Sequence, residues 1–420
     1  MLDMILKNGV VVTQNDKREI LKTNIGIKNG RIEKIGDDFT KAKIIIDASS
    51  YVITPAYLNG HIHFGEYYLR GYKEKLTTED YIILGEKFYK LFINEYERIR
   101  SSSIDNVMCE SIKNGTLTVM GVRGWPNVQK FGVNAFLGYP VMSSEKLDSY
   151  TDDLENRFNM LNKEENVEYF IGLHSLKWLS DKGLNKVMKF LALYNNTKLS
   201  LHVCETKDEV MYITQKYKMS PIKALSKFGL LNENTLLVHC NYLSNDDIDI
   251  IKQSNASVAV CHSSNLKLGN FPCDIRRLLD AEINVLIATD GPATSDSLSL
   301  LEALRVSALV SNVETQRLYD MITINPAKYM KINAGSIQVG NLADVLFYDR
   351  NELGITYPNA ILQNLVYIPS NKPCFVMKSG NFIIKNYEFV DDIKKILKEK
   401  NEIIKLIEMK AREQNFNFFS

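Results

Sequence analysis

The sequence predicts an α/β protein, a (β/α)8 TIM-type barrel with a small β-sandwich domain formed by both chain ends. Two observations support this fold. Short, uniformly apolar runs alternate with amphipathic segments through the middle of the chain, and both ends instead carry short runs separated by Gly and Asn turns. Uniformly apolar runs are typical of strands buried on both faces of a parallel sheet. Their alternation with helices over this length indicates a barrel or a doubly wound sheet.

The central region, residues 56–334, is expected to form the barrel. Its expected strands are the apolar runs at residues 117–122, 134–139, 169–173, 199–203, 236–238, 257–260 and 285–288. Its expected helices are the amphipathic segments at residues 78–96, 184–192, 245–252 and 300–310. Strands and helices that alternate in this way give a barrel of parallel strands with helices outside it.

The small β domain is expected to combine residues 1–55 with residues 335–390. Turn signals occur at Lys7-Asn8-Gly9, Lys28-Asn29-Gly30 and Ser379-Gly380-Asn381. Short runs separated by such Gly and Asn turns indicate antiparallel β structure. Residues 391–420 are expected to be a C-terminal helix and tail. The helix is amphipathic, so we expect a surface helix that packs on the barrel.

The composition excludes several classes of protein. The chain has 420 residues, of which 45% are hydrophobic and 24% are charged, and this is ordinary for a globular protein. Its 51 basic and 50 acidic residues leave a formal net charge of +1, so no global field attracts nucleic acid or an anionic membrane. No apolar run is long enough to span a bilayer, and the first residues make a poor signal peptide. The six cysteines form no CxxC pair, which predicts reduced thiols and a cytoplasmic location.

Several common catalytic motifs are absent from the sequence. It contains no GxxxxGK[ST] loop, no GxGxxG after a strand, no HExxH and no GxSxG. The PCxxC signature of the small zinc deaminases is also missing. Nucleotide hydrolysis, nicotinamide chemistry, metalloprotease chemistry and serine hydrolase chemistry therefore have no support.

The six histidines occupy similar positions along the chain. Each lies at or just beyond the C-terminal end of an apolar run, and the set is His61, His63, His174, His202, His239 and His262. The run that begins at Val285 ends at the equivalent place in Asp290. In a parallel barrel the C-terminal strand ends line one mouth, where the chemistry takes place. We therefore expect the six histidines to share one site.

A metal site is the simplest use of these side chains. His61 and His63 are two residues apart, so on a strand both point to the same face. With His202 and Asp290 they give three imidazoles and a carboxylate, a set that suits one Zn²⁺ ion, with Fe²⁺ as the alternative. Such an ion lowers the pKa of bound water to about 7. The run before His174 ends without a Lys that could bridge a second metal, so one ion is expected.

A carboxylate for proton transfer follows the same strand. Glu205 comes three residues after His202 and is expected to stand over the mouth. There it can carry protons between a water and a leaving amine. A role in capping the next helix is compatible with this one. Asp290 is open to the roles of ligand, base or both.

In these motifs the chain resembles the amidohydrolase superfamily, and most closely the branch of S-adenosylhomocysteine/methylthioadenosine deaminases, guanine deaminases and triazine hydrolases. The resemblance covers nearly the whole chain. It is carried by residues 53–63 (ITPAYLNGHIH), 69–71 (LRG), 202–206 (HVCET), 238–240 (VHC), 261–269 (CHSSNLKLG), 288–291 (ATDG) and 335–344 (GSIQVGNLAD).

The resemblance implies a role for each matching residue. His61, His63, His202 and Asp290 would bind the metal. Glu205 would be the proton shuttle, and His239 would hold the attacking water or the tetrahedral intermediate. His174 would contact the substrate. The chain departs from the branch at residues 64–68 (FGEYY) and 120–125 (MGVRGW).

These departures do not change the residues expected to bind the metal, but because of them the resemblance alone does not identify the substrate. We expect a pocket lined by loop residues that follow the apolar runs, namely Glu66, Tyr67, Arg70, Arg123, Trp125, His174 and Trp178. Aromatic side chains can stack on a planar ring, and Arg123 could bind an anionic substituent. For any one aromatic, simple packing of a loop on the barrel is an equally good interpretation.

The resulting hypothesis is a metal-dependent aminohydrolase that releases ammonia from an amino-substituted nitrogen heterocycle, such as a purine, pyrimidine, pterin or triazine. A close alternative is an amidohydrolase or chlorohydrolase that acts on a cyclic amide or another leaving group. An alternative of another class is a non-catalytic binding protein on the same scaffold. The expected partner is a small heterocyclic molecule, and a homo-oligomer is compatible with the sequence.

Overall fold

The computed structural model describes residues 1–122, 127–141, 167–354, 357, 360–368 and 371–413. The chain divides into two compact units. The first unit consists of Met1–Asn59, Met108–Thr118 and Leu298–Lys400, and the second of Gly60–Val107, Val119–Ser297 and Asn401–Ser420. The division into domains at residues 55, 334 and 390 stays a proposal. Every described residue of the expected site falls in the second unit.

Eight strands follow one another in sequence order to form the barrel sheet. They are β6 (Tyr57–His63), β7 (Thr116–Val122), β8 (Asn134–Val141), β9 (Val167–Leu173), β10 (Leu199–Val203), β11 (Thr235–His239), β12 (Ser257–Val260) and β13 (Val285–Ile287). The successive pairs from β8 and β9 to β12 and β13 are parallel. The Asp290 N–H donates to the His61 carbonyl at 3.1 Å, which links the loop after the last strand to the first strand. The expected parallel barrel is confirmed.

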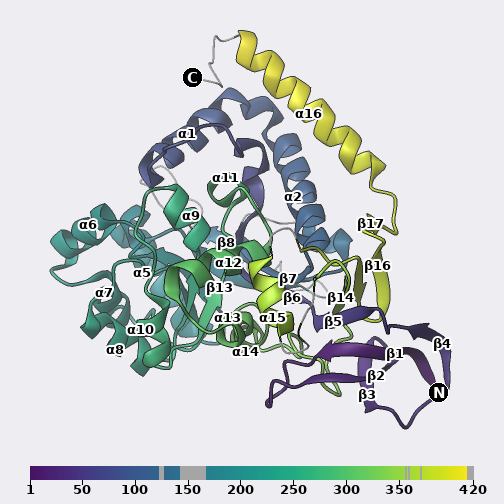
Figure 1. Ribbon diagram of the computed structural model, residues 1–420. Helices are drawn as coiled ribbons and strands as arrows, with labels where there is room; N and C mark the ends of the chain where they lie inside the picture. The colour runs from purple at the N-terminus through teal and green to yellow at the C-terminus, as the bar shows by residue number, and fades with distance from the viewer. Residues whose placement is uncertain (123–126, 142–166, 355–356, 358–359, 369–370, 414–420) are drawn as a thin grey trace. The chain divides into compact units, whose positions relative to one another are not determined.

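Helices of the second unit follow the barrel strands (Figure 1). They are α1 (Thr78–Leu91), α2 (Tyr96–Lys113, which continues into the first unit), α5 (Asp181–Leu193), α6 (Lys207–Tyr217), α7 (Pro221–Lys227), α8 (Asn245–Ser254), α9 (His262–Lys267), α10 (Ile275–Asp280) and α11 (Pro292–Ser295). Short 3-10 helices occur at η1 (Phe64–Leu69), η2 (Ile93–Glu95), η3 (Asn127–Phe131) and η4 (Leu176–Trp178). Local sequence starts several of these helices, because Thr77 with Asp80 and Ser244 with Asp247 form capping boxes at α1 and α8.

The C-terminal helix is α16 (Lys394–Glu413). Within the second unit, Ile403 of this helix is buried in a cluster with Phe88 in α1, Phe92 at the C-terminal end of α1 and Ile99 in α2. Glu402 pairs with Arg98 at 2.8 Å. Figure 1 shows α16 in yellow beside α1 and α2. The apolar side of the helix therefore packs as the sequence predicts.

Nine strands from the two chain ends form the sheet of the first unit. They are β1 (Leu2–Val12), β2 (Ile20–Lys28), β3 (Arg31–Gly36), β4 (Ala42–Asp47), β5 (Tyr51–Pro55), β14 (Val345–Asp349), β15 (Phe375–Lys378), β16 (Asn381–Lys385) and β17 (Glu388–Phe389). Strand β5 joins the N-terminal strands to β14, so both ends contribute as expected. The sheet is mixed and not wholly antiparallel, because β4 and β5 run parallel to β1. This unit also contains α12 (Leu300–Ser311), α13 (Thr315–Asp320), α14 (Ile324–Met330) and α15 (Ile361–Tyr367).

Two of the three turn signals form hairpin turns. Lys28-Asn29-Gly30 joins β2 to β3, and Ser379-Gly380-Asn381 joins β15 to β16. The prediction of a turn at Lys7-Asn8-Gly9 was wrong, since these residues lie inside β1 where its pairing with β2 shifts register. Asn8 has a φ of 63°, and its N–H donates to Asn24 Oδ1 at 2.8 Å. An Asn with positive φ forms a bulge here because both flanks of the segment pair with the same strand.

Among the described residues, no helix has the length and apolar character needed to cross a membrane.

Candidate active site

Five of the six histidines lie together where the barrel strands end. His61 and His63 belong to β6, His174 follows β9, and His202 and His239 belong to β10 and β11. The ring centroid of His202 lies 5.0 Å from those of His61 and His174, and 5.3 Å from that of His239. Parallel strands bring these side chains to one edge of the sheet, so the shared site forms for five of the six.

The sixth histidine departs from the prediction. His262 is the first residue of α9, and its buried ring lies 2.8 Å by Nε2 from the Cys273 carbonyl. It is not part of the group of three imidazoles that could hold a metal among the described residues. In the sequence, His262 follows an apolar run just as the other five histidines do. The difference arises because β12 ends at Val260 and the chain has already turned into a helix at His262.

Three imidazoles converge on one point. The Nε2 atoms of His61, His63 and His202 are separated by 3.0 Å, 3.2 Å and 3.3 Å. Asp290 Oδ1 lies 3.6 Å from His61 Nε2 and 3.3 Å from His63 Nε2. Ligands in a tetrahedron around Zn²⁺ at bonds of about 2.1 Å would be about 3.4 Å apart. These donor atoms therefore fit a single metal ion.

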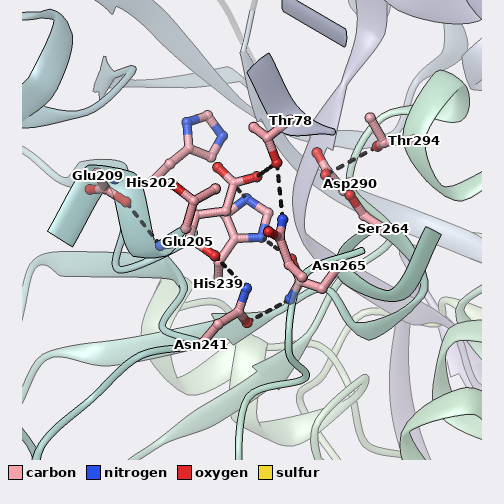
Figure 2. A network of polar contacts seen from close by, with 12 residues as sticks. Thr78, His202, Glu205, Glu209, His239, Asn241, Ser264, Asn265, Asp290 and Thr294 are labelled. Atoms are coloured by element: carbon pink, nitrogen blue, oxygen red, sulfur yellow. Dashed lines mark hydrogen bonds and ion pairs between the residues drawn. The ribbon is translucent and has the colours of Figure 1, made fainter. Parts of the chain in front are cut away.

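In three of these four side chains, those of His63, His202 and Asp290, the opposite atom contacts a polar group of the protein. His202 Nδ1 lies 2.8 Å from the His174 carbonyl, and His63 Nδ1 lies 3.1 Å from Glu66 Oε1. Asp290 Oδ2 accepts hydrogen bonds from Ser264 Oγ at 2.5 Å and Thr294 Oγ1 at 3.1 Å (Figure 2). These contacts orient the rings and the carboxylate, and they leave Nε2 and Oδ1 available to a metal.

The electrostatics favour the ligand form of His61, His202 and Asp290. Burial lowers the pKa of His61 to about 4, and burial together with the neighbouring imidazoles lowers the pKa of His202 well below its ordinary value. Burial alone would raise the pKa of Asp290, but the hydrogen bond with His61 and the nearby His63 outweigh it and hold that pKa well below its usual range. Neutral imidazoles and an ionised carboxylate are the forms that bind metals.

Glu205 stands beside this group, in the turn between β10 and α6. Its Oε1 accepts a hydrogen bond from Thr78 Oγ1 at 3.1 Å, and its Oε2 lies 3.8 Å from His239 Nε2 (Figure 2). Its backbone N–H donates to Glu209 at 2.9 Å. The carboxylate is therefore held close to His239, with one oxygen directed at the imidazole.

The backbone at these strand ends adopts positive φ angles at residues other than glycine. The angles are 53° at Cys204, 77° at His239, 54° at Cys240 and 61° at Asp290. Such conformations cost free energy and persist where the surrounding structure fixes them, which is common at functional sites. The strained residues therefore lie at three of the strand ends that carry the polar side chains, those of β10, β11 and β13.

Three polar side chains beside Glu205 and His239 were not singled out from the sequence. Asn265 Oδ1 lies 3.0 Å from His239 Nδ1, and Asn265 donates to Asn241 Oδ1 at 2.7 Å. Thr78 is the third, and nothing in the sequence relates it to Glu205 because 127 residues separate them. Both amides had a usable signal, since Asn265 lies in the family motif at residues 261–269 and Asn241 comes two residues after His239 at the end of β11.

The residues expected to line the substrate pocket fall into two groups. Glu66 contacts His63, and the guanidinium of Arg70 lies over the Tyr67 ring at 4.9 Å. The Trp178 ring lies edge-on to His174, with 6.1 Å between centroids. Glu66, His174 and Trp178 are thus close to the histidines, whereas Tyr67 and Arg70 contact each other at the end of η1. For all five residues, contact with substrate stays a prediction. Arg123 and Trp125 lie outside the described residues.

Comparisons with known proteins find relatives in sequence and in fold. A 5-methylthioadenosine/S-adenosylhomocysteine deaminase of Thermococcus sibiricus is 29% identical over 389 residues, which cover 87% of this chain and 90% of the relative. The fold matches a zinc-bound adenosine deaminase of Xanthomonas campestris with a TM-score of 0.86 at 20% identity, over 96% of this chain and 99% of the other. It also matches a zinc complex of atrazine chlorohydrolase from Arthrobacter aurescens, with a TM-score of 0.87 at 18% identity over 96% and 100% of the two chains.

A model of the amidohydrolase family matches residues 52–383. This span contains the whole barrel and every ligand candidate, and it is far more than half of the chain. The chain therefore belongs to the amidohydrolase family.

Proposed function

We propose that this protein is a metal-dependent deaminase that hydrolyses the exocyclic amine of a nitrogen heterocycle, with an adenine nucleoside derivative as the first candidate. The observation that carries the proposal is the convergence of His61, His63, His202 and Asp290 beside Glu205 and His239. The similarity to a deaminase of adenosine derivatives supports the choice of substrate class.

His61, His63, His202 and Asp290 would hold one metal ion, and we propose Zn²⁺. The fit rests on the 3.0–3.3 Å spacing of the three Nε2 atoms and on the neutral imidazoles that burial favours. When bound, Zn²⁺ would act as a Lewis acid that makes water a nucleophile near neutral pH. Fe²⁺ accepts similar ligands and is the alternative.

The side chains of the site would then move the protons of the reaction. Water attacks the ring carbon that carries the amine, and Asp290 accepts a proton from that water. Glu205 donates a proton to the ring nitrogen, and His239 orients the attacking water. Asp290 then passes its proton to the amine, the carbon–nitrogen bond breaks and ammonia leaves. The remaining hydroxyl proton returns to Glu205, so a ring carbonyl is left and both carboxyl groups regain their starting states.

An assay of ammonia release tests the proposal. The zinc-loaded protein is supplied in turn with adenine nucleosides, guanine, amino-pyrimidines, pterins and amino-triazines, and the metal content of the same sample is measured. Turnover that disappears on chelation and returns with Zn²⁺ is the expected result. Release of chloride from a chlorotriazine without ammonia release would favour a chlorohydrolase. Protein that binds no metal and turns over nothing would favour a binding protein on this scaffold.

The six cysteines form no disulfide in the structure. Four of them, Cys204, Cys240, Cys261 and Cys273, are buried and have raised pKa values because of burial. Reduced, unreactive thiols suit a reducing compartment, so we place the proposed reaction in the cytoplasm.

A further inference from the structure

A chain of hydrogen bonds joins the backbone of Glu205 to the ring of His239. Asn241 Nδ2 donates to the Glu205 carbonyl at 3.0 Å, Asn265 Nδ2 donates to Asn241 Oδ1 at 2.7 Å, and Asn265 Oδ1 lies 3.0 Å from His239 Nδ1 (Figure 2). His239 and Asn265 are buried, with 2% and 0% of their surface exposed. Water therefore has little access to the end of the chain that meets the imidazole.

The direction of every bond in this chain follows from its first member. A backbone carbonyl oxygen can only accept, so Asn241 must present its NH₂ group to Glu205 and its oxygen to Asn265. Asn265 must then use its own NH₂ group for Asn241, which leaves its oxygen for His239. An oxygen that accepts requires a hydrogen on Nδ1. Without this constraint, a neutral imidazole can carry its hydrogen on either nitrogen.

We infer that Asn241 and Asn265 are positioning residues that hold His239 in the tautomer with the hydrogen on Nδ1 and a lone pair on Nε2. The inference deepens the proposed function, and its catalytic meaning rests on that function. Asn241 does this without any contact to the imidazole that the structure records, because it acts through Asn265.

The tautomer decides what the site can bind at Nε2. Glu205 Oε2 lies 3.8 Å from His239 Nε2, which is too far for a direct hydrogen bond. In this tautomer Nε2 is an acceptor, so the space beside it suits a group with hydrogens to donate, such as the attacking water or a leaving amine. A hydrogen on Nε2 would instead suit a carbonyl oxygen of the substrate. The chain of amides therefore selects water and amine chemistry over polarisation of a carbonyl.

Nitrogen NMR of the histidines tests the inference directly. The full-length, zinc-loaded protein is labelled with ¹⁵N-histidine, and long-range ¹H–¹⁵N correlations report which nitrogen of each ring carries the hydrogen. The chain has only six histidines, and a His239→Gln variant identifies the signals of His239. The expected result is a protonated Nδ1 and an unprotonated Nε2 at neutral pH.

Substitutions of Asn241 test whether the two amides fix the tautomer of His239. Asn241→Leu removes the link to the Glu205 carbonyl, so Asn265 can rotate and His239 should show a mixture of tautomers. Turnover should fall roughly tenfold to a hundredfold, with zinc content unchanged, because a catalytic group has lost its orientation. Asn241→Asp keeps an oxygen that accepts from Asn265 and should keep the Nδ1 hydrogen. Asn270→Leu is the matched control, since this amide donates to Thr78 Oγ1 at 2.9 Å and should leave the tautomer unchanged.

Two outcomes would overturn the inference: a hydrogen on Nε2 in the parent protein, or an Asn241→Leu variant whose tautomer and turnover match the parent. The tautomer is observed without any substrate. If no heterocycle releases ammonia while the spectra agree with the expectation, the proposed function fails and the assigned tautomer stands.

Discussion

At the scale of single residues, the ring of His63 lies between the metal group and Glu66, an acid that the sequence predicts to line the substrate pocket. Its Nε2 belongs to the metal group, and its Nδ1 lies 3.1 Å from the buried carboxylate of Glu66. Room for this acid comes from Gly291, where a Cβ would lie 2.1 Å from Glu66 Oε2. Glu66 is thus placed to orient a ligand, in addition to any contact it makes with substrate.

A Glu66→Gln substitution should therefore weaken metal binding. The amide keeps an acceptor for Nδ1 but removes the negative charge, so the imidazole becomes a poorer ligand. We expect the dissociation constant for Zn²⁺ to rise roughly tenfold to a hundredfold. Competition with a chromogenic chelator measures this constant. An unchanged value would show that Glu66 serves the substrate alone.

Glu205→Gln should separate proton transfer from metal binding. Glu205 is not one of the four ligands, so the variant should contain as much zinc as the parent. Turnover should fall roughly a hundredfold or more, which is the usual scale for the loss of a general acid–base. Metal analysis and steady-state kinetics on the same preparation give both numbers. Near-normal turnover in the zinc-loaded variant would mean that another group carries the proton.

At the scale of elements, two helix N-termini hold Glu205 in place. Helix α1 supplies Thr78, whose hydroxyl accepts from Asn270 and so directs its own hydrogen to Glu205. Helix α6 supplies Glu209, which accepts the backbone N–H of Glu205. The carboxylate of Glu205 and the turn that carries it are thus fixed by different helices.

Thr78→Val should lower turnover without unfolding α1. Valine has nearly the same shape, and the capping box of α1 uses Thr77 and Asp80 rather than Thr78. A hydrogen bond to a charged group contributes about 1.5–3 kcal/mol, so we expect a loss of roughly tenfold or more in kcat. Thr78→Ser keeps the hydroxyl and should retain most of the activity. Equal losses in both variants would point to packing and not to the hydrogen bond.

Glu209 should make the stability of the protein depend on pH. Burial raises its pKa from an ordinary 4.5 to about 8. Between these values the folded protein keeps the proton while the unfolded chain releases it, so stability should fall as the pH rises through this window. The slope from this one group is at most about 1.4 kcal/mol per pH unit, and it ends above pH 8.

Glu209→Gln removes this titration and keeps an oxygen for the backbone N–H. The melting temperature of the variant relative to the parent should therefore rise between pH 5 and about pH 8. Thermal unfolding of both proteins in a series of buffers measures the difference. A constant difference across the series would show that Glu209 is not protonated in the folded protein.

At the scale of the whole molecule, the metal group joins distant parts of the chain. Its proposed ligands come from β6, β10 and the loop after β13, from His61 to Asp290. The same loop bonds to β6 through the Asp290 N–H and the His61 carbonyl. An ion bound there would add a second connection where the first and last barrel strands meet.

Removal of the metal should therefore lower the thermal stability. A ligand that binds only the folded protein adds about 2.7 kcal/mol when its concentration is a hundred times its dissociation constant. The melting temperature of chelator-treated protein should rise with added Zn²⁺. His202→Gln should abolish this rise, and His262→Gln should preserve it, because a Gln amide can still donate to the Cys273 carbonyl. The same zinc response in both variants would contradict the assignment of the ligands.

The sequence by itself determined the barrel and much of the metal group. Buried parallel strands must be apolar on both faces, so β7 to β13 are visible as apolar runs, and the residue that follows each run is placed at the barrel mouth by the fold alone. An HxH pair on a strand must present both rings to one side, which is why the sequence predicts that His61 and His63 lie together. The family motifs added the proposed role of Glu205.

Only the tertiary structure decided the contacts between side chains that come from different loops. Thr78 reaches Glu205 across 127 residues, and Glu66 turns to His63, because the loops at the mouth fold against one another in ways that no local pattern encodes. The sequence also did not predict two local features. Asn8 forms a bulge where a turn was expected, and His262, two residues after the end of β12, already begins a helix. The physical reason is the same in each case. The periodicity of strands and helices reflects the burial of apolar surface, and the order of apolar and polar residues in the sequence shows it directly. The partner of a polar group depends instead on which loops meet in space.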